Sequence, residues 1–162
     1  MLNVKTGNSI NPNAAAAGKE AAAMVKENLT DMKMAFVYSG VQYDQKELLA
    51  SIASELPGVP LIGNTSFTGV ITPDGYISAD DGFTGIMALS DADLTVGVAG
   101  MPKEGTARQT GHKVAEKALK AAGRTDAPAY FYMAAPSGFR NYRSNRPCAF
   151  LRRQCGRQYN HR

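Results

Sequence analysis

The chain has 162 residues, of which 44% are hydrophobic and 20% are charged, and its formal net charge at neutral pH is +4. This size and composition are typical of one soluble globular domain and argue against wholesale disorder. Apolar runs stay well short of the roughly 18 residues that a membrane-spanning helix needs, and the first residues carry no secretory signal. We therefore expect a cytoplasmic protein without a membrane partner.

The positive charge belongs to the C-terminal end. Residues 1–138 carry 9 lysines, 2 arginines and 14 acidic residues, a balance of −3, whereas the other seven arginines fall from Arg140 onward. The body is mildly acidic, so a nucleic-acid partner is not expected. Cys148, Cys155 and His161 are too few and too widely spaced for a structural zinc site, and common phosphate-binding and hydrolase motifs are absent. We predict neither a metal nor a cofactor.

The first half of the chain reads as a helix followed by a β-α-β unit. Residues 14–29 have helical spacing behind Asn13, a favourable N-cap, and 34–39 form a short apolar strand. Asp44 with Glu47 resembles a capping box that opens a second helix, which Pro57 and Gly58 end, before a strand at 59–63. Residues expected to face the core are Ala17, Ala21, Met24, Val25, Leu29, Leu48, Leu49, Ile52 and Leu56.

The second half predicts an antiparallel meander over 75–79, 82–90 and 94–100. A third helix should begin at a Thr106–Gln109 capping box and end near Gly123, with Val114, Ala118 and Leu119 inward, and 129–135 should form a buried strand. The predicted fold is mixed α/β (α+β): one mixed sheet with a β-α-β unit followed by an antiparallel meander, and helices packed on the sheet. Residues 1–13 are assigned to an N-terminal extension and 14–138 to the domain, which we expect to be incomplete at its C-terminus.

Residues 139–162 differ from the rest in composition because arginine replaces lysine and acidic residues disappear. Three interpretations stay open: an RNA-binding arm, a solvated end, and an out-of-frame continuation of a normal domain.

The functional prediction rests on the loop that follows the strand at 59–63. The two parallel strands of a β-α-β unit end at the same sheet edge, where open sheets bind ligands. Small polar residues of 63–69 suit a small ligand held by hydrogen bonds, although a plain connection would use similar residues. The candidate ligand-binding residues are Ser39, Asn64, Thr65, Ser66, Thr68 and Ser137. The alternative is a small hydrolase-like enzyme with Ser66 or Thr65 as nucleophile, but no base stands at a recognisable spacing.

Residues 35–100 contain, in order, a strand, "YD" before the helix, "LPGVPLIG", a small-residue loop, "I-x-P-x-G" and a strand of the "G-x-M-A-L" kind. In this combination of features the chain resembles the N-terminal part of the FIST family of sensory domains. The resemblance implies a prokaryotic intracellular sensory domain that binds a small molecule, an amino acid or a small organic anion. It also implies a FIST C-terminal domain or a signalling output protein as partner. Asn64 and Val70 stand where many relatives have a cysteine and an acidic residue.

Overall fold

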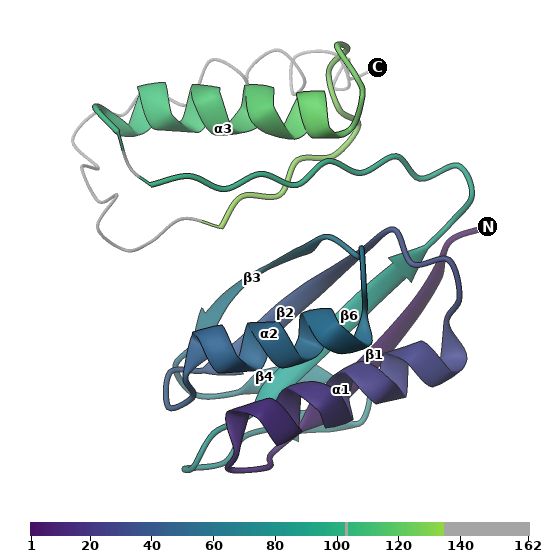
Figure 1. The fold of residues 1–162 in the computed structure, drawn as a ribbon, viewed down its shortest axis with the longest axis vertical. Helices are drawn as coiled ribbons and strands as arrows, with labels where there is room; N and C mark the ends of the chain where they lie inside the picture. Colours follow the sequence, from purple (N-terminus) through teal and green to yellow (C-terminus); the bar gives the residue numbers. More distant parts are fainter. Residues whose placement is uncertain (103, 135–162) are drawn as a thin grey trace, which may run out of the picture.

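The computed structural model describes residues 1–102 and 104–134 (Figure 1). The strands are β1 (Asn3–Ser9), β2 (Met34–Gly40), β3 (Leu61–Ser66), β4 (Val70–Thr72), β5 (Gly75–Ile77) and β6 (Thr84–Ser90). The helices are α1 (Ala14–Asn28), α2 (Gln45–Glu55) and α3 (Ala107–Ala121).

The main sheet has the strand order β1-β6-β2-β3, so β1 and β3 are its edges. β2 and β3 are parallel, with Ser39 opposite Thr65, which confirms the β-α-β unit. β6 lies antiparallel to both β1 and β2, and β4 pairs with β5 in a separate hairpin. The mixed α/β fold class is therefore confirmed.

The predicted meander needs correction in its pairing. β6 does not pair with β5, the strand before it in the chain, but inserts between β1 and β2, and residues 94–100 form no strand. Residues 3–9, assigned to an extension, form the edge strand β1. Its polar sequence, with only Val4 among large apolar residues, carried no strand signal.

The three helix starts agree with their predicted caps. The Asn13 side chain accepts a hydrogen bond from the backbone of Ala16, and Asp44 accepts from Lys46 and Glu47. Thr106 and Gln109 form a full capping box at α3, and Gly123, with a φ of +64°, follows the C-cap of that helix. These local hydrogen bonds satisfy the free N–H groups of each first turn, which is why they could be read from the sequence.

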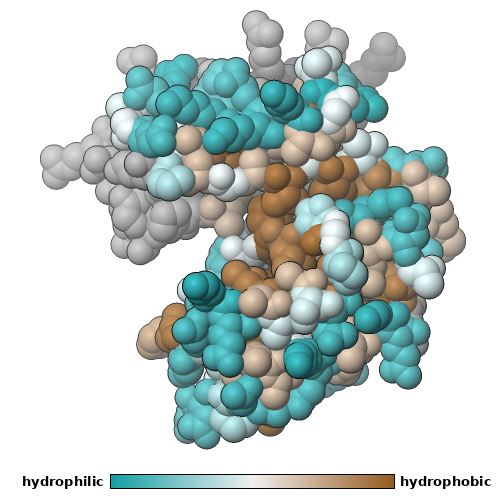
Figure 2. All heavy atoms as spheres, viewed as in Figure 1, coloured by the Kyte–Doolittle hydropathy of each residue, from teal (hydrophilic) through white to brown (hydrophobic). Residues whose placement is uncertain are grey.

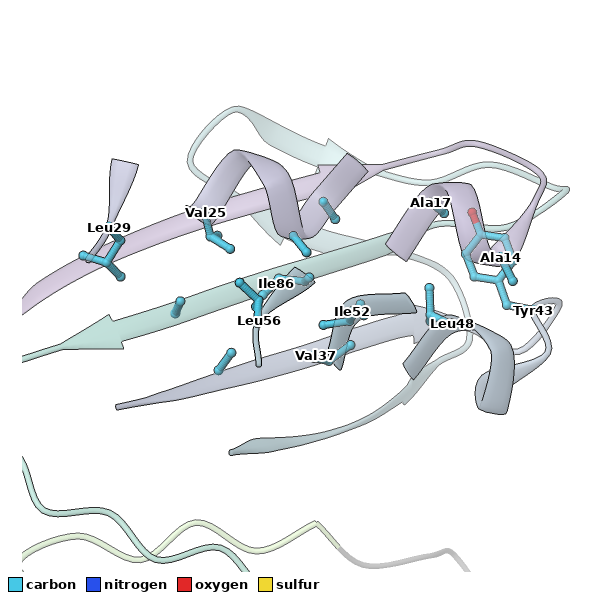
Figure 3. Packing of buried hydrophobic residues seen from close by; sticks show 14 residues of the cluster. Ala14, Ala17, Val25, Leu29, Val37, Tyr43, Leu48, Ile52, Leu56 and Ile86 are labelled. Atoms are coloured by element: carbon cyan, nitrogen blue, oxygen red, sulfur yellow. The ribbon is translucent and has the colours of Figure 1, made fainter. Parts of the chain in front are cut away.

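α1 and α2 pack side by side on one face of the sheet and enclose the core (Figures 1 and 3). The core residues that Figure 3 labels come from both helices, from β2 and β6, and from the Tyr43 turn; they include Ala17, Val25, Val37, Ile52 and Ile86. Two predicted core residues are wrong: Met24 is 42% exposed and Leu49 is 41% exposed. Each helix has a narrower buried stripe than its apolar residues suggest.

Three glycines set how closely these layers approach. A Cβ at Gly7 would stand 2.1 Å from the Ala21 carbonyl oxygen, and one at Gly18 would stand 2.0 Å from Ser51 Oγ. At Gly63 a Cβ would be 1.6 Å from the carbonyl oxygen of Val37 on β2. These contacts bring α1 against β1, α1 against α2, and β3 against β2, with no room for a larger residue.

Among the described residues, no helix packs directly against the other sheet face; α3 lies on that side, with extended chain between it and the sheet (Figure 1). Apolar residues gather where the α3 region faces the sheet, and polar residues cover the outer side of α3 (Figure 2). Tyr132 reaches this face: its ring meets Phe36 edge-on at 5.1 Å between centroids, and its hydroxyl lies 2.8 Å from that of Tyr38. The predicted strand at 129–135 is wrong over its described residues 129–134, where Tyr130 is exposed.

We predict that Gly63→Ala lowers the free energy of unfolding by about 3 kcal/mol, because the added methyl group must push β3 away from β2. Gly111→Ala is the matched control: its Cβ would meet nothing within 4 Å inside α3, so it should be neutral or stabilising by up to about 1 kcal/mol. Urea unfolding followed by circular dichroism measures both. Equal stability of the two variants would contradict the close strand approach.

A second prediction concerns pH. Burial, with help from the Tyr132 hydroxyl and the neighbouring Tyr130, raises the pKa of Tyr38 from 10.0 to about 12. The fold therefore favours the neutral phenol, and this contribution is complete below pH 10 and is lost as the pH rises toward 12. The free energy of unfolding should fall over this range in urea titrations, and less so in Tyr38→Phe. The exposed Tyr76→Phe serves as control; a parent-like decline in Tyr38→Phe would refute the assignment.

Candidate ligand-binding site

A cavity of about 450 Å³ lies between α2 and the edge strand β3, over the end of β2. It is open to solvent along β3, because no strand pairs with the far edge of β3 among the described residues. Its lining residues are Val37, Ser39, Gln45, Leu49, Ala50, Ala53, Leu61, Ile62, Gly63, Asn64 and Thr65. Three of the candidate residues thus line one cavity: Ser39, Asn64 and Thr65.

Ser39 is held in place by the start of α2. It is buried, and its Oγ donates a hydrogen bond to Gln45 Oε1 at 2.8 Å. Gln45 Nε2 in turn donates to the carbonyl oxygens of Gly40 at 2.9 Å and Tyr43 at 3.1 Å. Since the Ser39 proton is committed to Gln45, the serine oxygen can offer only lone pairs to a ligand. Ser39 is thus an oriented acceptor beside the exposed hydroxyl of Thr65, its partner in register.

Asn64 occupies a different position from Ser39 and Thr65. It pairs in register with Tyr38, and side chains alternate along a strand, so its amide belongs to the sheet face that carries Tyr38. Ser39 and Asn64 lie near the C-terminal ends of two adjacent parallel strands, but the alternation directs their side chains to opposite faces of the sheet.

Ser66 and Thr68 are absent from the cavity lining and lie at the base of the β4–β5 hairpin. Ser66 Oγ donates to the carbonyl oxygen of Gly69 at 2.6 Å, and the Thr68 carbonyl oxygen accepts from Ser78 Oγ at 2.6 Å. The expected loop at 63–69 is wrong over its first residues, because β3 continues to Ser66. Ser137 lies outside the described residues.

Sequence reasoning missed the α2 side of the cavity, formed by Gln45, Leu49, Ala50 and Ala53. The available signal was the surplus of apolar residues on this helix: with Leu48 and Ile52 filling the core, Leu49 remained for a second surface.

Among the described residues, no ionisable side chain lines the cavity. Leu49, Ala50 and Ala53 of α2 and the first residues of β3 are apolar, whereas Ser39, Gln45, Thr65 and the backbone edge of β3 supply hydrogen-bonding groups. This combination suits a small molecule that has an apolar body and a polar head.

Neither proposed nucleophile is activated within the part of the chain that the structure describes. The Ser66 proton goes to a backbone carbonyl rather than to a base, and no hydrogen bond joins the Thr65 hydroxyl to a described His, Lys or carboxylate. Across residues 1–102 and 104–134, no three His, Cys, Asp or Glu side chains cluster as metal ligands; Cys148, Cys155 and His161 lie outside this range. No described helix is long and apolar enough to cross a bilayer.

Comparison with known families agrees with the resemblance seen in the sequence. The family model for the FIST N domain matches residues 33–150, which is more than half of the chain. The matched range begins beside β2, leaves β1 and α1 outside, and continues through residues 139–150. No curated protein matches the chain.

We predict that Ser39→Ala costs about 1 to 2 kcal/mol of unfolding free energy, because the part-buried Gln45 Oε1 loses its donor. Thr65→Val, at the exposed residue opposite it, should change stability by less than about 0.5 kcal/mol. Chemical unfolding of both variants tests this difference. Should Ser39→Ala be as stable as the parent, the serine would not anchor the end of β2 to α2.

Proposed function

Because the chain belongs to the FIST N domain family, we propose that it is the ligand-binding input domain of an intracellular, prokaryotic signalling system. The members of this family are sensory domains of signal transduction, and they are characterised by ligand binding rather than by catalysis. The observation that carries the proposal is the cavity between α2 and β3, in which Ser39 and Thr65 lie next to each other at the ends of two parallel strands.

The ligand class we propose is an amino acid or a small organic anion. Leu49, Ala53 and Leu61 would contact its apolar part, while the Ser39 oxygen and the Thr65 hydroxyl would bind its polar end. A cavity of about 450 Å³ lies within the range of small-molecule sites.

Signalling requires that the ligand bind two conformations with different affinity. β3 is the element suited to this role, since it lines the cavity and leads within a few residues into the β4–β5 hairpin. A change in the position of β3 would therefore be passed to the hairpin. The output would be read by a FIST C-terminal domain or by a signalling protein in the cytoplasm.

We expect at least one member of a panel of amino acids and small carboxylates to raise the melting temperature, because a ligand that binds only the folded state stabilises it. Ala53→Phe, which fills the cavity from α2, should abolish the shift in melting temperature. Thr65→Val should weaken ligand binding about tenfold and make the shift correspondingly smaller.

Thr68→Val is the matched control, since it makes the same chemical change three residues later, outside the lining. It should leave the ligand-induced shift intact. A panel without any effect on the parent, or an equal response of Ala53→Phe, would refute this cavity as the sensory site.

A further inference from the structure

The β4–β5 hairpin exposes three large apolar side chains. Ile71 and Tyr76 are cross-strand partners and are 87% and 60% exposed, and Phe67, just before β4, is 84% exposed. We call Phe67, Ile71 and Tyr76 the outer hairpin face. Single exposed apolar residues are common, but three on so short an element form a patch of the kind that marks interaction sites.

The hairpin is braced rather than loose. Val70 sits directly on the sheet, since a Cβ at Gly85 of β6 would lie 3.0 Å from its Cγ2. The Tyr76 ring lies over the backbone of Gly69, where a Cβ would meet it at 2.6 Å. At the tip, the Thr72 hydroxyl donates to the Gly75 carbonyl oxygen at 3.1 Å and accepts from the Asp74 N–H at 3.2 Å. The outer hairpin face is therefore presented by a supported scaffold, which lowers the entropic cost of docking.

Three carboxylates lie in or directly after the hairpin in the sequence, and Lys5 lines a cavity together with Pro73 of the hairpin turn. Asp74 lies in the turn, Asp80 and Asp81 follow β5, and all three are exposed. None of the three carboxylates forms an ion pair with a residue that the structure describes. The sequence contains no Lys, Arg or His between Lys46 and Lys103, so this charge is uncompensated along the chain.

We propose that the outer hairpin face is a docking surface for a separate protein that offers an apolar cleft bordered by lysines or arginines. The apolar residues would fill the cleft, and the three carboxylates would meet the basic border. The same charges oppose self-association, because two copies would bring like charges together. This surface lies outside the ligand cavity and does not rest on its occupancy.

The test begins with a photo-cross-linking residue, p-benzoylphenylalanine, at position 71 of the full chain in its native cells, with position 2 as control. Leu2 is also an exposed apolar residue, 53% exposed, but it precedes the far end of β1. The cross-linked protein is identified by mass spectrometry, purified and titrated against the full chain.

Three variants then examine the interface. Phe67→Ser with Ile71→Ser should weaken binding at least tenfold without changing the melting temperature, because both side chains are already exposed. Leu2→Ser should bind as the parent does. Asp80→Asn with Asp81→Asn should weaken binding at low salt, mainly by slowing association, and the difference should vanish at high salt.

Other results would overturn the proposal. These are cross-links only to a second copy or only to residues 135–162 of the same chain, a yield at position 71 no higher than at position 2, and binding that the hairpin or aspartate substitutions leave unchanged. Because no ligand enters these measurements, their outcome is separable from that of the thermal-shift panel.

Discussion

The candidate site depends on one backbone contact between two strands. Gly63 lies so close to Val37 that a Cβ there would stand 1.6 Å from its carbonyl oxygen. Only a residue without a side chain permits this approach, and the approach continues the parallel pairing toward Ser39 and Thr65. The same residue keeps the cavity open, since Gly63 lines it without filling it. The requirement for strand pairing and the requirement for space therefore fall on one position.

The two sheet faces are stabilised differently. On one face, α1 and α2 exclude water from a continuous apolar core. The burial of this core contributes the larger share of the folding free energy. On the other face, the contacts described above come from two separate segments: Val70 packs on Gly85, and Tyr132 packs against Phe36 and Tyr38. A domain built in this way can change the second face without unfolding the first. The segment of Tyr132 and the β4–β5 hairpin, the latter as one braced unit, are thus the elements best placed to shift relative to the core.

Local features of the fold could be predicted from sequence, and non-local features could not. Asn13, Asp44 and Thr106 cap helices through hydrogen bonds within three residues, so each carries its own signal. The insertion of β6 between β1 and β2 is decided by long-range pairing that leaves no local pattern. For the site, the parallel course of the strands that carry Ser39 and Asn64 followed from the β-α-β rule, but the face of Asn64 depended on β3 continuing to Ser66. Residues 64–66 are small and polar, so no signal in the sequence indicated that β3 continues through them.

The charge distribution favours one of the two proposed ligand classes. Among the described residues, the cavity has no ionisable lining, and the N–H groups of Lys46 and Glu47 at the start of α2 are already taken by Asp44. An organic anion would therefore meet no basic side chain from the described part of the chain. An ammonium group, in contrast, can donate to the Ser39 oxygen, whose proton is committed to Gln45. From the described side chains, we therefore propose an amino acid with an apolar side chain, rather than a simple carboxylate, as the ligand.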